Sequence, residues 1–411
     1  MKKRIQSVAI IGGGPSGSAL ACHLVQRGLK VVLFDDGARP EMIVGESLIP
    51  SILPMLDRLG VRERVAAVGQ YKPGVSFVFS ENETLAFDFQ AVASCKMPTY
   101  AYNVPRHAFD GVIADRAVEL GVVKIPQRAK LERVGADGIQ LGAESLALFG
   151  DEQPDLMVDA TGRARAFARL LEIPARTGDR KDVAYFAHYE GFAEEEPRGQ
   201  VIINRLAVGW SWRIPLPGRL SVGVVLNREE AATLGDTPEQ RLEAVIERDP
   251  SLSAAGKMRR RVTNVATYTN YQLISERAHG PGWVMVGDAY GFVDPMLSPG
   301  LMLALRSAEL LADSLNNLPN YAKQMEHWLE AWQELIEYFY NGQMFAMYHT
   351  GMSIERKYPG VASRIMQRHV ERNIACMASG AATLSRYSRG MVRFLSKHGS
   401  WMGNPAELAI V

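Results

Sequence analysis

The stretch VAIIGGGPSGSALACHL, residues 8–24, decides how the N-terminal part of this chain folds. An apolar run enters a glycine cluster, and a helical pattern follows at once. Gly12, Gly14 and Gly17 have the spacing G-x-G-x-x-G, in which backbone amides and the N-terminus of the helix hold a pyrophosphate. Ser16 lies inside the same turn and is expected to contact the same ligand. The stretch therefore predicts the strand, turn and helix that open a dinucleotide-binding βαβ unit.

The next strand-like run, residues 31–34, ends at Asp35. A carboxylate at the end of this strand meets a ribose hydroxyl of the bound dinucleotide and favours a nucleotide without a 2′-phosphate. Two later apolar runs, at 155–160 and 283–287, are predicted to return to the same sheet. The cofactor domain is thus expected to be assembled from segments far apart in the chain.

The composition is that of a globular protein with no general affinity for polyanions. Lys and Arg number 46 against 45 Asp and Glu, a net charge of +1, so neither nucleic acid nor an acidic membrane is predicted as a partner. No run approaches the ~18 consecutive apolar residues that a membrane span needs. The N-terminal apolar run enters the glycine turn directly, which indicates a first strand and not a signal peptide.

The three cysteines, Cys22, Cys95 and Cys376, are far apart and include no C-x-x-C pair. This pattern predicts neither a disulfide framework nor a zinc site, and it favours a reducing, cytoplasmic location. The histidines show no metal-ligand spacing, so no metal is predicted. His188, on a predicted strand, is the one histidine that we consider as a catalytic acid or base.

At 411 residues the chain exceeds what one hydrophobic core usually supports. Alternating apolar residues at 74–89 predict a hairpin turning near Glu81 and Asn82, and three strand-like runs between 181 and 227 predict an antiparallel sheet. The last hundred residues are mostly helical and rich in Met. The predicted division is a cofactor domain over 1–180 with a hairpin insertion at about 70–100, a substrate-domain sheet over 181–275, a return of the cofactor domain over 276–320, and a helical region over 321–411.

Three segments resemble those of the p-hydroxybenzoate hydroxylase-like flavoproteins, a group that holds flavin monooxygenases, flavin-dependent halogenases and geranylgeranyl-reductase-like enzymes. They are VPRHAFDGVIADRA (104–117), DLMVDATG (155–162) and WVMVGDAYGFVDP (283–295). The resemblance covers residues 5 to about 315 and implies an FAD cofactor. The fold class is therefore expected to be α/β, with a Rossmann-like FAD-binding domain, an inserted antiparallel β-sheet substrate domain and a helical C-terminal region.

The same resemblance implies roles for individual residues. Gly287 and Asp288 belong to the segment whose aspartate binds the ribitol of FAD. The stretch from Pro295 to Gly300 would line the isoalloxazine ring, and Arg106 would lie near the flavin.

Further segments resemble those of the flavin-dependent halogenases. VGESLIPS (44–51) would bring Glu46 and Ser47 to the flavin, and QYKPGVSF (70–77) puts Lys72 where halogenases carry the lysine that takes up hypohalous acid. A buried primary amine would have a lowered pKa and could direct a neutral oxidant, whereas the alternative is an ordinary lysine of an edge strand. Three more candidate residues come from GWSWRIPL and GFVDPMLSPG, namely Trp210, Trp212 and Ser298. The two indoles share one face of a strand, so they could equally be a packed wall.

The chain departs from the halogenase pattern at Phe79-Ser80, where an aromatic-glycine pair is usual, and at Ser298-Pro299-Gly300, where Ser or Thr usually precedes the glycine. Residues 270–301 are more similar to flavoproteins that accompany tryptophylquinone enzymes. The leading prediction is therefore an FAD-dependent monooxygenase. It would use reduced FAD and O2, through a C4a-hydroperoxide, to hydroxylate a tryptophan or another indole, free or in a partner polypeptide.

Three alternatives stay open. One is a halogenase of an aromatic metabolite that uses Lys72, another is a polyprenyl reductase, and the last is a noncatalytic FAD-bound assembly factor. No second nucleotide fingerprint is present, so the electrons are expected from NAD(P)H that docks transiently or from a separate flavin reductase.

Overall fold

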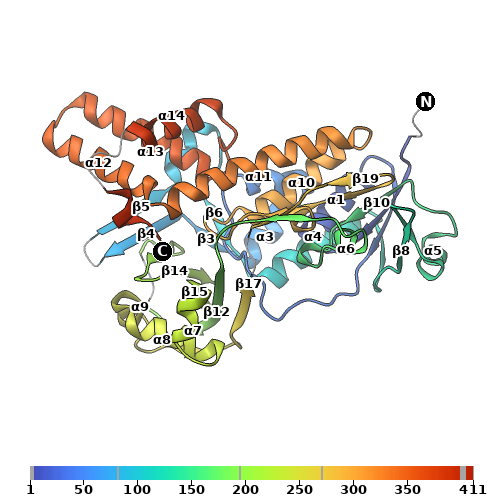
Figure 1. Ribbon diagram of the computed structural model, residues 1–411, viewed down its shortest axis with the longest axis horizontal. Helices are drawn as coiled ribbons and strands as arrows, with labels where there is room; N and C mark the ends of the chain where they lie inside the picture. The colour runs from blue at the N-terminus through green and yellow to red at the C-terminus, as the bar shows by residue number, and fades with distance from the viewer. Residues whose placement is uncertain (1–3, 81–82, 194–195, 270–271, 399–403, 411) are drawn as a thin grey trace.

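The computed structural model describes residues 4–80, 83–193, 196–269, 272–398 and 404–410 of the chain. Figure 1 shows a cofactor sheet with its helices at one end of the molecule, a second sheet beside it, and a lobe of C-terminal helices at the far end. The predicted turn at Glu81 and Asn82 lies outside the described residues.

The cofactor sheet is parallel at its centre, and its strands are buried on both faces, as expected when helices cover both sides. Four residues of its central strand, 8–11, are buried. The order is β19 (His279–Gly280), β20 (Trp283–Met285), β10 (Leu156–Asp159), β1 (Ser7–Ile11), β2 (Lys30–Phe34) and β7 (Val123–Ile125), with only β19 antiparallel among these strands. Both later segments that were expected to return to this sheet do so.

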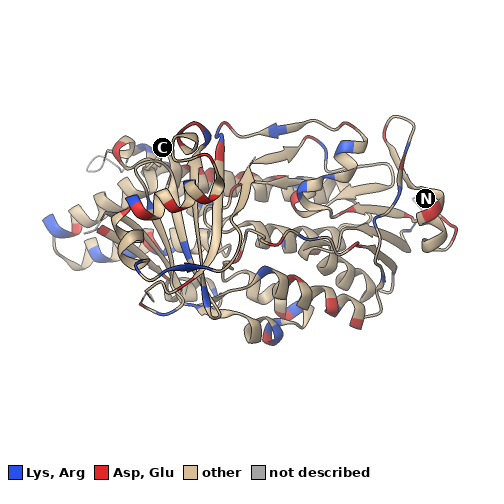
Figure 2. Cartoon of the chain, turned by 90° about the horizontal axis from the view of Figure 1, so that it is seen from below, with Lys and Arg blue, Asp and Glu red and all other residues tan. Residues whose placement is uncertain are grey.

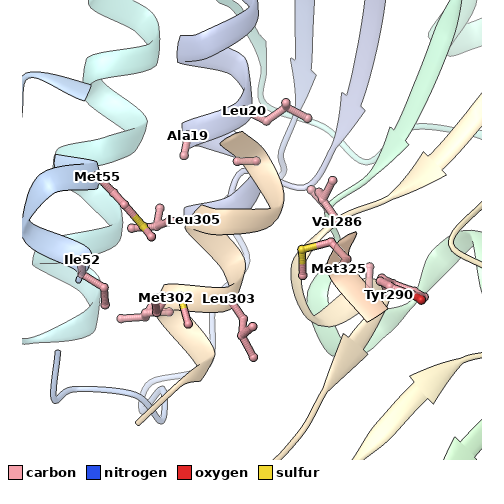
Figure 3. Close-up of a cluster of buried hydrophobic side chains, with 14 of the residues drawn as sticks. Ala19, Leu20, Ile52, Met55, Val286, Tyr290, Met302, Leu303, Leu305 and Met325 are labelled. Carbon is pink, nitrogen blue, oxygen red and sulfur yellow. The ribbon is translucent and has the colours of Figure 1, made fainter. Parts of the chain in front are cut away.

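Helix α10 (Gly300–Asp313) packs between the other helices of the cofactor domain and covers their apolar faces. Figure 3 shows Leu305 of α10 facing Met55 of α2 (Ile52–Leu59), with α1 (Pro15–Val25) alongside. Pro15 is the first residue of α1, where the missing N–H costs nothing and the fixed φ suits a helix. The glycine turn is therefore held in place by a helix that is itself deeply packed.

A second, eight-stranded sheet forms the substrate side. The middle one of the three predicted strand runs is two strands, β13 (Val201–Arg205) and β14 (Trp210–Leu216), because residues 206–209 turn the chain back. The sheet is also not purely antiparallel, since β13 pairs in parallel with β4 (Gly74–Ser80) of the N-terminal hairpin. The path is β16 (Arg260–Arg261), β12 (Asp182–Glu190), β15 (Arg219–Asn227), β14, β13, β4 and β5 (Glu83–Asp88), with β17 (Ala266–Thr269) also pairing with β12.

The two faces of β12 have different neighbours. Tyr185 and Tyr189 belong to an apolar cluster with α7 (Arg228–Thr233), α8 (Pro238–Arg248) and α9 (Pro250–Ala255). Because side chains alternate along a strand, Phe186 and His188 point to the opposite face, where Phe186 joins the main core. This face lies toward the cofactor domain.

Shorter elements connect these layers. They are α3 (Arg62–Val68), β3 (Gln70–Lys72), η1 (Phe89–Cys95), β6 (Ala101–Asn103), α4 (Arg106–Glu119), β8 (Leu131–Val134), β9 (Gly138–Leu141), α5 (Ala143–Phe149), η2 (Gly162–Ala164), α6 (Ala166–Leu170), β11 (Ala175–Thr177), β18 (Leu273–Ser275), η3 (Gly287–Ala289), β21 (Gly291–Phe292) and α15 (Pro405–Leu408). Helices α2 and α3 are separate because Gly60 takes a left-handed conformation after α2.

The C-terminal region is helical, as expected, and consists of α11 (Leu318–Tyr340), α12 (Gln343–Lys357), α13 (Val361–Ala378) and α14 (Arg386–His398), followed by α15. One expectation is wrong here: Cys95 and Cys376 form a disulfide between η1 and α13. The partners are 281 residues apart in sequence, so only the packing of α13 on η1 brings them together. Cys22 is free and buried.

No helix in the described part of the chain is long and apolar enough to cross a membrane. Figure 2 shows basic and acidic residues interspersed along the molecule, consistent with the near-zero net charge.

Shortening Leu305 should test the central position of α10. Leu305 is 1% exposed, so Leu305→Ala is expected to lower the free energy of unfolding by about 2–5 kcal/mol. Val118→Ala, on α4 at a side chain that is 50% exposed, should change it by less than about 0.5 kcal/mol. Chemical denaturation of both variants measures the difference, and equal small effects would contradict this packing.

Candidate functional site

A cavity of about 700 Å³ runs between the cofactor sheet and the second sheet. At one end it is lined by the glycine turn and Asp35, and at the other by Lys72, Trp210 and Trp212. Four residues of the segment 295–300 line the same cavity, namely Pro295, Leu297, Ser298 and Gly300. A single space therefore joins the predicted dinucleotide site to the predicted catalytic residues.

The glycine turn has the shape that a pyrophosphate requires. Gly12 has φ +106°, and a Cβ at Gly17 would lie 2.0 Å from the Gly12 carbonyl oxygen, so both positions need glycine for the fold itself. A Cβ at Gly14, in contrast, would meet no protein atom within 4 Å. The space above Gly14 is thus open to the cavity, and Gly12, Gly14 and Ser16 all line it. These residues fit a dinucleotide.

Asp35 lies at the carboxyl end of β2, buried at the cavity wall. Its carboxylate is 3.0 Å from the Arg39 guanidinium and 3.3 Å from the Lys124 amine. Burial alone would raise the pKa of Asp35, but the two cations outweigh it and hold this pKa below its usual value. The group is therefore an ionised acceptor, suited to ribose hydroxyls.

Arg106 and Asp288 also line the cavity. Arg106 forms a bidentate pair with Asp110, one turn along α4, and also donates to the Val44 carbonyl oxygen. Burial raises the pKa of Asp288 to about 6, although the charges of Arg106 and Arg163 oppose this. Asp288 can thus present either a hydroxyl or a carboxylate to a ligand near neutral pH.

Lys72 is 3% exposed and ends the short strand β3. Its Nζ donates to Ser47 Oγ at 2.7 Å and to the Leu48 carbonyl oxygen at 2.9 Å, and lies 5.1 Å from the Phe89 ring centroid. No carboxylate pairs with it in the described structure. Burial therefore lowers the pKa of Lys72 to about 7.

Glu46 precedes Ser47, but its hydrogen-bond partner is His188 of the second sheet and not Lys72. Its Oε1 lies 2.7 Å from Nε2 of His188, and both side chains are about 5% exposed. Glu46 lines the cavity, whereas His188 stands behind it on β12. His188 thus reaches the cavity only through Glu46.

Trp210 and Trp212 lie on the cavity side of β14, with ring centroids 5.7 Å apart. Trp210 Nε1 donates to the Tyr340 hydroxyl at 3.1 Å, and that hydroxyl donates to Asp294 at 3.0 Å. Burial raises the pKa of Asp294 to about 7. The indole of Trp210 is thereby linked, through the end of α11, to the segment beside the predicted flavin ring.

The segment that precedes α10 has unusual backbone geometry. Leu297 and Ser298 have φ of +66° and +58°, a region that non-glycine residues rarely adopt. Such conformations cost of order 1–3 kcal/mol each and persist where the surrounding structure imposes them. Ser298 and Gly300 both line the cavity.

Most of the predicted site residues therefore line one cavity, although their roles stay predictions. Three do not line it. Gly17 packs beneath the turn, His188 stands behind Glu46, and Gly287, with φ +57°, donates its N–H to Ser307 below the cavity wall. From its position in a sequence motif, a residue that lines the cavity cannot be told from one that packs behind the cavity wall.

The aromatic lining near Lys72 was not predicted from the sequence. The ring centroid of Phe77 lies 5.7 Å from that of Phe87 and 5.2 Å from that of Phe339. The cavity wall also includes Phe89 and Phe186. The alternation of Phe77, Phe79, Phe87 and Phe89 in the hairpin was the available signal. This alternation predicts two strands, but it does not tell which face of the strands lines the cavity.

A family model described as tryptophan halogenase matches residues 7–98 and 88–349. Tryptophan 2-halogenase of Chondromyces crocatus is 31% identical over 326 residues, which is 76% of this chain and 61% of that protein. A 1H-pyrrole-2-carbonyl peptidyl-carrier-protein brominase of Pseudoalteromonas luteoviolacea (strain 2ta16) is 28% identical over 75% of this chain and 76% of its own length. This chain spans 61% and 64% of the length of two of its curated relatives.

Solved structures share the fold. The flavin-dependent brominase Bmp2 superposes with a TM-score of 0.72 at 22% identity, over 96% of this chain and 98% of the other. A flavoprotein/dehydrogenase from Cytophaga hutchinsonii superposes with a TM-score of 0.79 at 21% identity, over 96% and 98%. The expected α/β class with its helical C-terminal region is confirmed.

Filling the space above Gly14 should remove the cofactor without unfolding the protein. Gly14→Val places a side chain where the pyrophosphate would lie, so we expect loss of bound flavin with little change in thermal stability. Gly17→Ala should instead destabilise the fold, because its Cβ meets backbone. Flavin absorbance and thermal unfolding of both variants check this, and full flavin binding by Gly14→Val would disprove the site.

Proposed function

The chain belongs to the tryptophan halogenase family, and from this membership we propose that it is an FAD-dependent halogenase of an electron-rich aromatic ring. The family match favours the halogenation alternative over the leading prediction of hydroxylation. It adds no support for a polyprenyl reductase, for an assembly factor, or for the similarity to flavoproteins of tryptophylquinone biogenesis.

The cofactor is FAD, and the cavity offers it groups of suitable chemistry along its length. The glycine turn would hold the pyrophosphate, Asp35 a ribose and Asp288 the ribitol, with Pro295 to Gly300 beside the flavin ring. Bound and reduced, FAD supplies with O2 the oxidising equivalent that turns a halide into an electrophile. The remaining requirements, which are to guide that electrophile, orient the ring and exclude water, fall to the protein.

The main observation that supports this proposal is the hydrogen bonding of the buried Lys72 amine. A protonated amine has three N–H donors, and two are already directed to Ser47 and the Leu48 carbonyl. The third is then available to hydrogen-bond a neutral hypohalous acid and hold it near the substrate ring. The neutral amine has only two N–H groups, so it would lose this donor. We therefore assign the protonated form to the reaction.

The aromatic lining indicates the substrate class. Trp210, Trp212, Phe77 and Phe87 border the cavity on the Lys72 side and suit a flat, apolar ring. Some relatives are named for a pyrrole ring carried by a peptidyl carrier protein. We accordingly propose that the ring is an indole, pyrrole or phenol, free or carried by a polypeptide.

Hydroxylation remains the second candidate because of Pro299. A halide is an anion, and the N-terminus of a helix binds anions through free backbone N–H groups. Pro299 is the N-cap of α10, between the cavity-lining residues Ser298 and Gly300, and proline has no N–H to donate. This position is therefore less suited to hold a halide than a serine or threonine would be.

Removing the amine tests halogenation. Lys72→Met retains the volume of the side chain but no donor, so we expect halogenated product to fall by at least ~100-fold while bound FAD is unchanged. Lys257→Met removes an exposed lysine of the loop after α9 and should have no effect. Because the pKa of Lys72 is about 7, wild-type halogenation should decrease as pH rises through about 7. Product yield is measured by mass spectrometry, and undiminished halogenation by Lys72→Met would refute the role.

Oxygen isotopes separate the two candidate reactions. With reduced FAD, 18O2 and bromide, a halogenase should yield a brominated ring without heavy oxygen. A hydroxylase should add 18O to the ring at the same rate with or without bromide. Indole, pyrrole and tryptophan-containing peptides serve as test substrates. Heavy oxygen in the ring together with no bromine would replace our proposal by the second candidate.

A further inference from the structure

A second cavity, of about 680 Å³, opens beside the first. The two share a wall that includes Tyr268, Asp288 and Phe292, so the second cavity borders the predicted flavin site from outside. The rest of its lining comes from residues 40–42, from η2 and α6, from residues 264–268, and from Leu273. Neither the motifs nor the proposed halogenation assigns it a ligand.

Three arginines line this cavity within seven residues of sequence, namely Arg163, Arg165 and Arg169. Arg163 donates to the Thr269 carbonyl oxygen, and Arg165 donates to Ser275 Oγ at 2.8 Å. No carboxylate lies within ion-pair distance of the three guanidinium groups among the described residues. In contrast, Arg389 and Arg393 of the same chain both pair with Glu334.

The cluster has no carboxylate in direct ion-pair contact in the described structure, although Glu41 and Asp288 also line the cavity and Asp288 feels the charge of Arg163. Arg165 and Arg169 are four residues apart, and burial together with the charge of Arg169 lowers the pKa of Arg165. The buried Asp159 also acts electrostatically on Arg165, but its oxygens accept from Thr161 and the Phe167 N–H. Nε of Arg165 is buried and without a hydrogen-bond partner in the described structure. A bound anion with several oxygens would satisfy these donors.

The lining of the cavity also includes apolar and aromatic side chains. Tyr268 and Phe292 present rings, and Val265 and Leu273 add aliphatic surface. The Arg163 guanidinium lies 5.1 Å from the Tyr268 ring centroid, so the cationic and aromatic parts meet. A ligand that fits both would combine phosphates with a flat ring, which is the chemistry of a nucleotide.

We propose that the second cavity binds a phosphate-bearing redox nucleotide, either a nicotinamide dinucleotide or a free flavin nucleotide, that delivers electrons to the enzyme. The inference rests on the proposed function only in that each turnover consumes two electrons. A reduced nicotinamide would pass a hydride to the flavin, so the nicotinamide is oxidised by two electrons and FAD is reduced by the same two. A reduced flavin nucleotide would be oxidised by two electrons in the same way.

Binding to the FAD-loaded protein tests this without halide or substrate. Isothermal titration at low ionic strength uses NAD+, NADP+ and FMN as unreactive probes of the two sources. We expect at least one probe to bind saturably below about 1 mM, and its affinity to fall as salt is added. Saturation by NAD+ or NADP+ would identify a nicotinamide donor, and saturation by FMN a flavin donor. Failure of all three probes to bind would overturn the inference.

Charge reversal locates the binding. Arg169 is exposed on the short helix α6 and takes no part in the first cavity, so Arg169→Glu should keep FAD and the thermal unfolding temperature. We expect it to raise the dissociation constant of the bound probe at least tenfold. Arg248→Glu makes the same charge change at the end of α8, outside both cavities, and should leave the constant unaltered. Equal dissociation constants in wild type and Arg169→Glu would reject the site.

A second variant, at Arg165, tests the same site independently of Arg169. Arg165→Gln removes the charge but retains a donor toward Ser275, and it should weaken the same probe in the same direction. Since these titrations need no halogenation, they can succeed when Lys72→Met disproves the halogenase, and they can fail when the halogenase is correct.

Discussion

The hydrogen bonds of residues 44–48 hold the site together. Within this short segment, the Val44 carbonyl accepts from Arg106, Glu46 bonds His188 of the second sheet, and Ser47 and Leu48 accept from Lys72. The segment thus joins the cofactor domain, the substrate sheet and the buried amine. Burying a lysine costs free energy unless its donors are satisfied, and these two acceptors satisfy two of the three N–H groups of the protonated amine. Displacing the segment would disturb all three parts at once.

The other side of the cavity depends on α10 and α11. Helix α10 begins where the left-handed residues Leu297 and Ser298 end, and its buried side chains pack against α1 and α2. Tyr340, at the end of α11, links Asp294 to Trp210. The segment beside the flavin ring and the aromatic wall are therefore positioned by the same pair of packed helices. Such a rigid, largely apolar enclosure strengthens the few polar interactions within it.

The contacts that could not be predicted from the sequence join distant segments of the chain. The hairpin at 74–88 was recognised, but its parallel pairing with β13 was not, because pairing between separate strands leaves no periodic signal. Cys95 and Cys376 appeared unpaired because their spacing is uninformative until α13 packs on η1. His188 was singled out as one histidine on a strand, yet its partner Glu46 could not be deduced.

Local sequence by itself determined the glycine turn, the buried strands of the cofactor sheet and the helical C-terminal region, because backbone conformation and hydrophobic periodicity depend on neighbouring residues. Resemblance to segments of known flavoproteins and halogenases pointed to Lys72, Trp210, Trp212 and Asp288 as candidates. Only the tertiary structure decided that they line one cavity, that the Lys72 amine is buried with two acceptors, and that three arginines with no ion-paired carboxylate among the described residues border a second cavity. Burial, charge compensation and cavity shape arise where segments from different parts of the chain meet, and no single segment contains them.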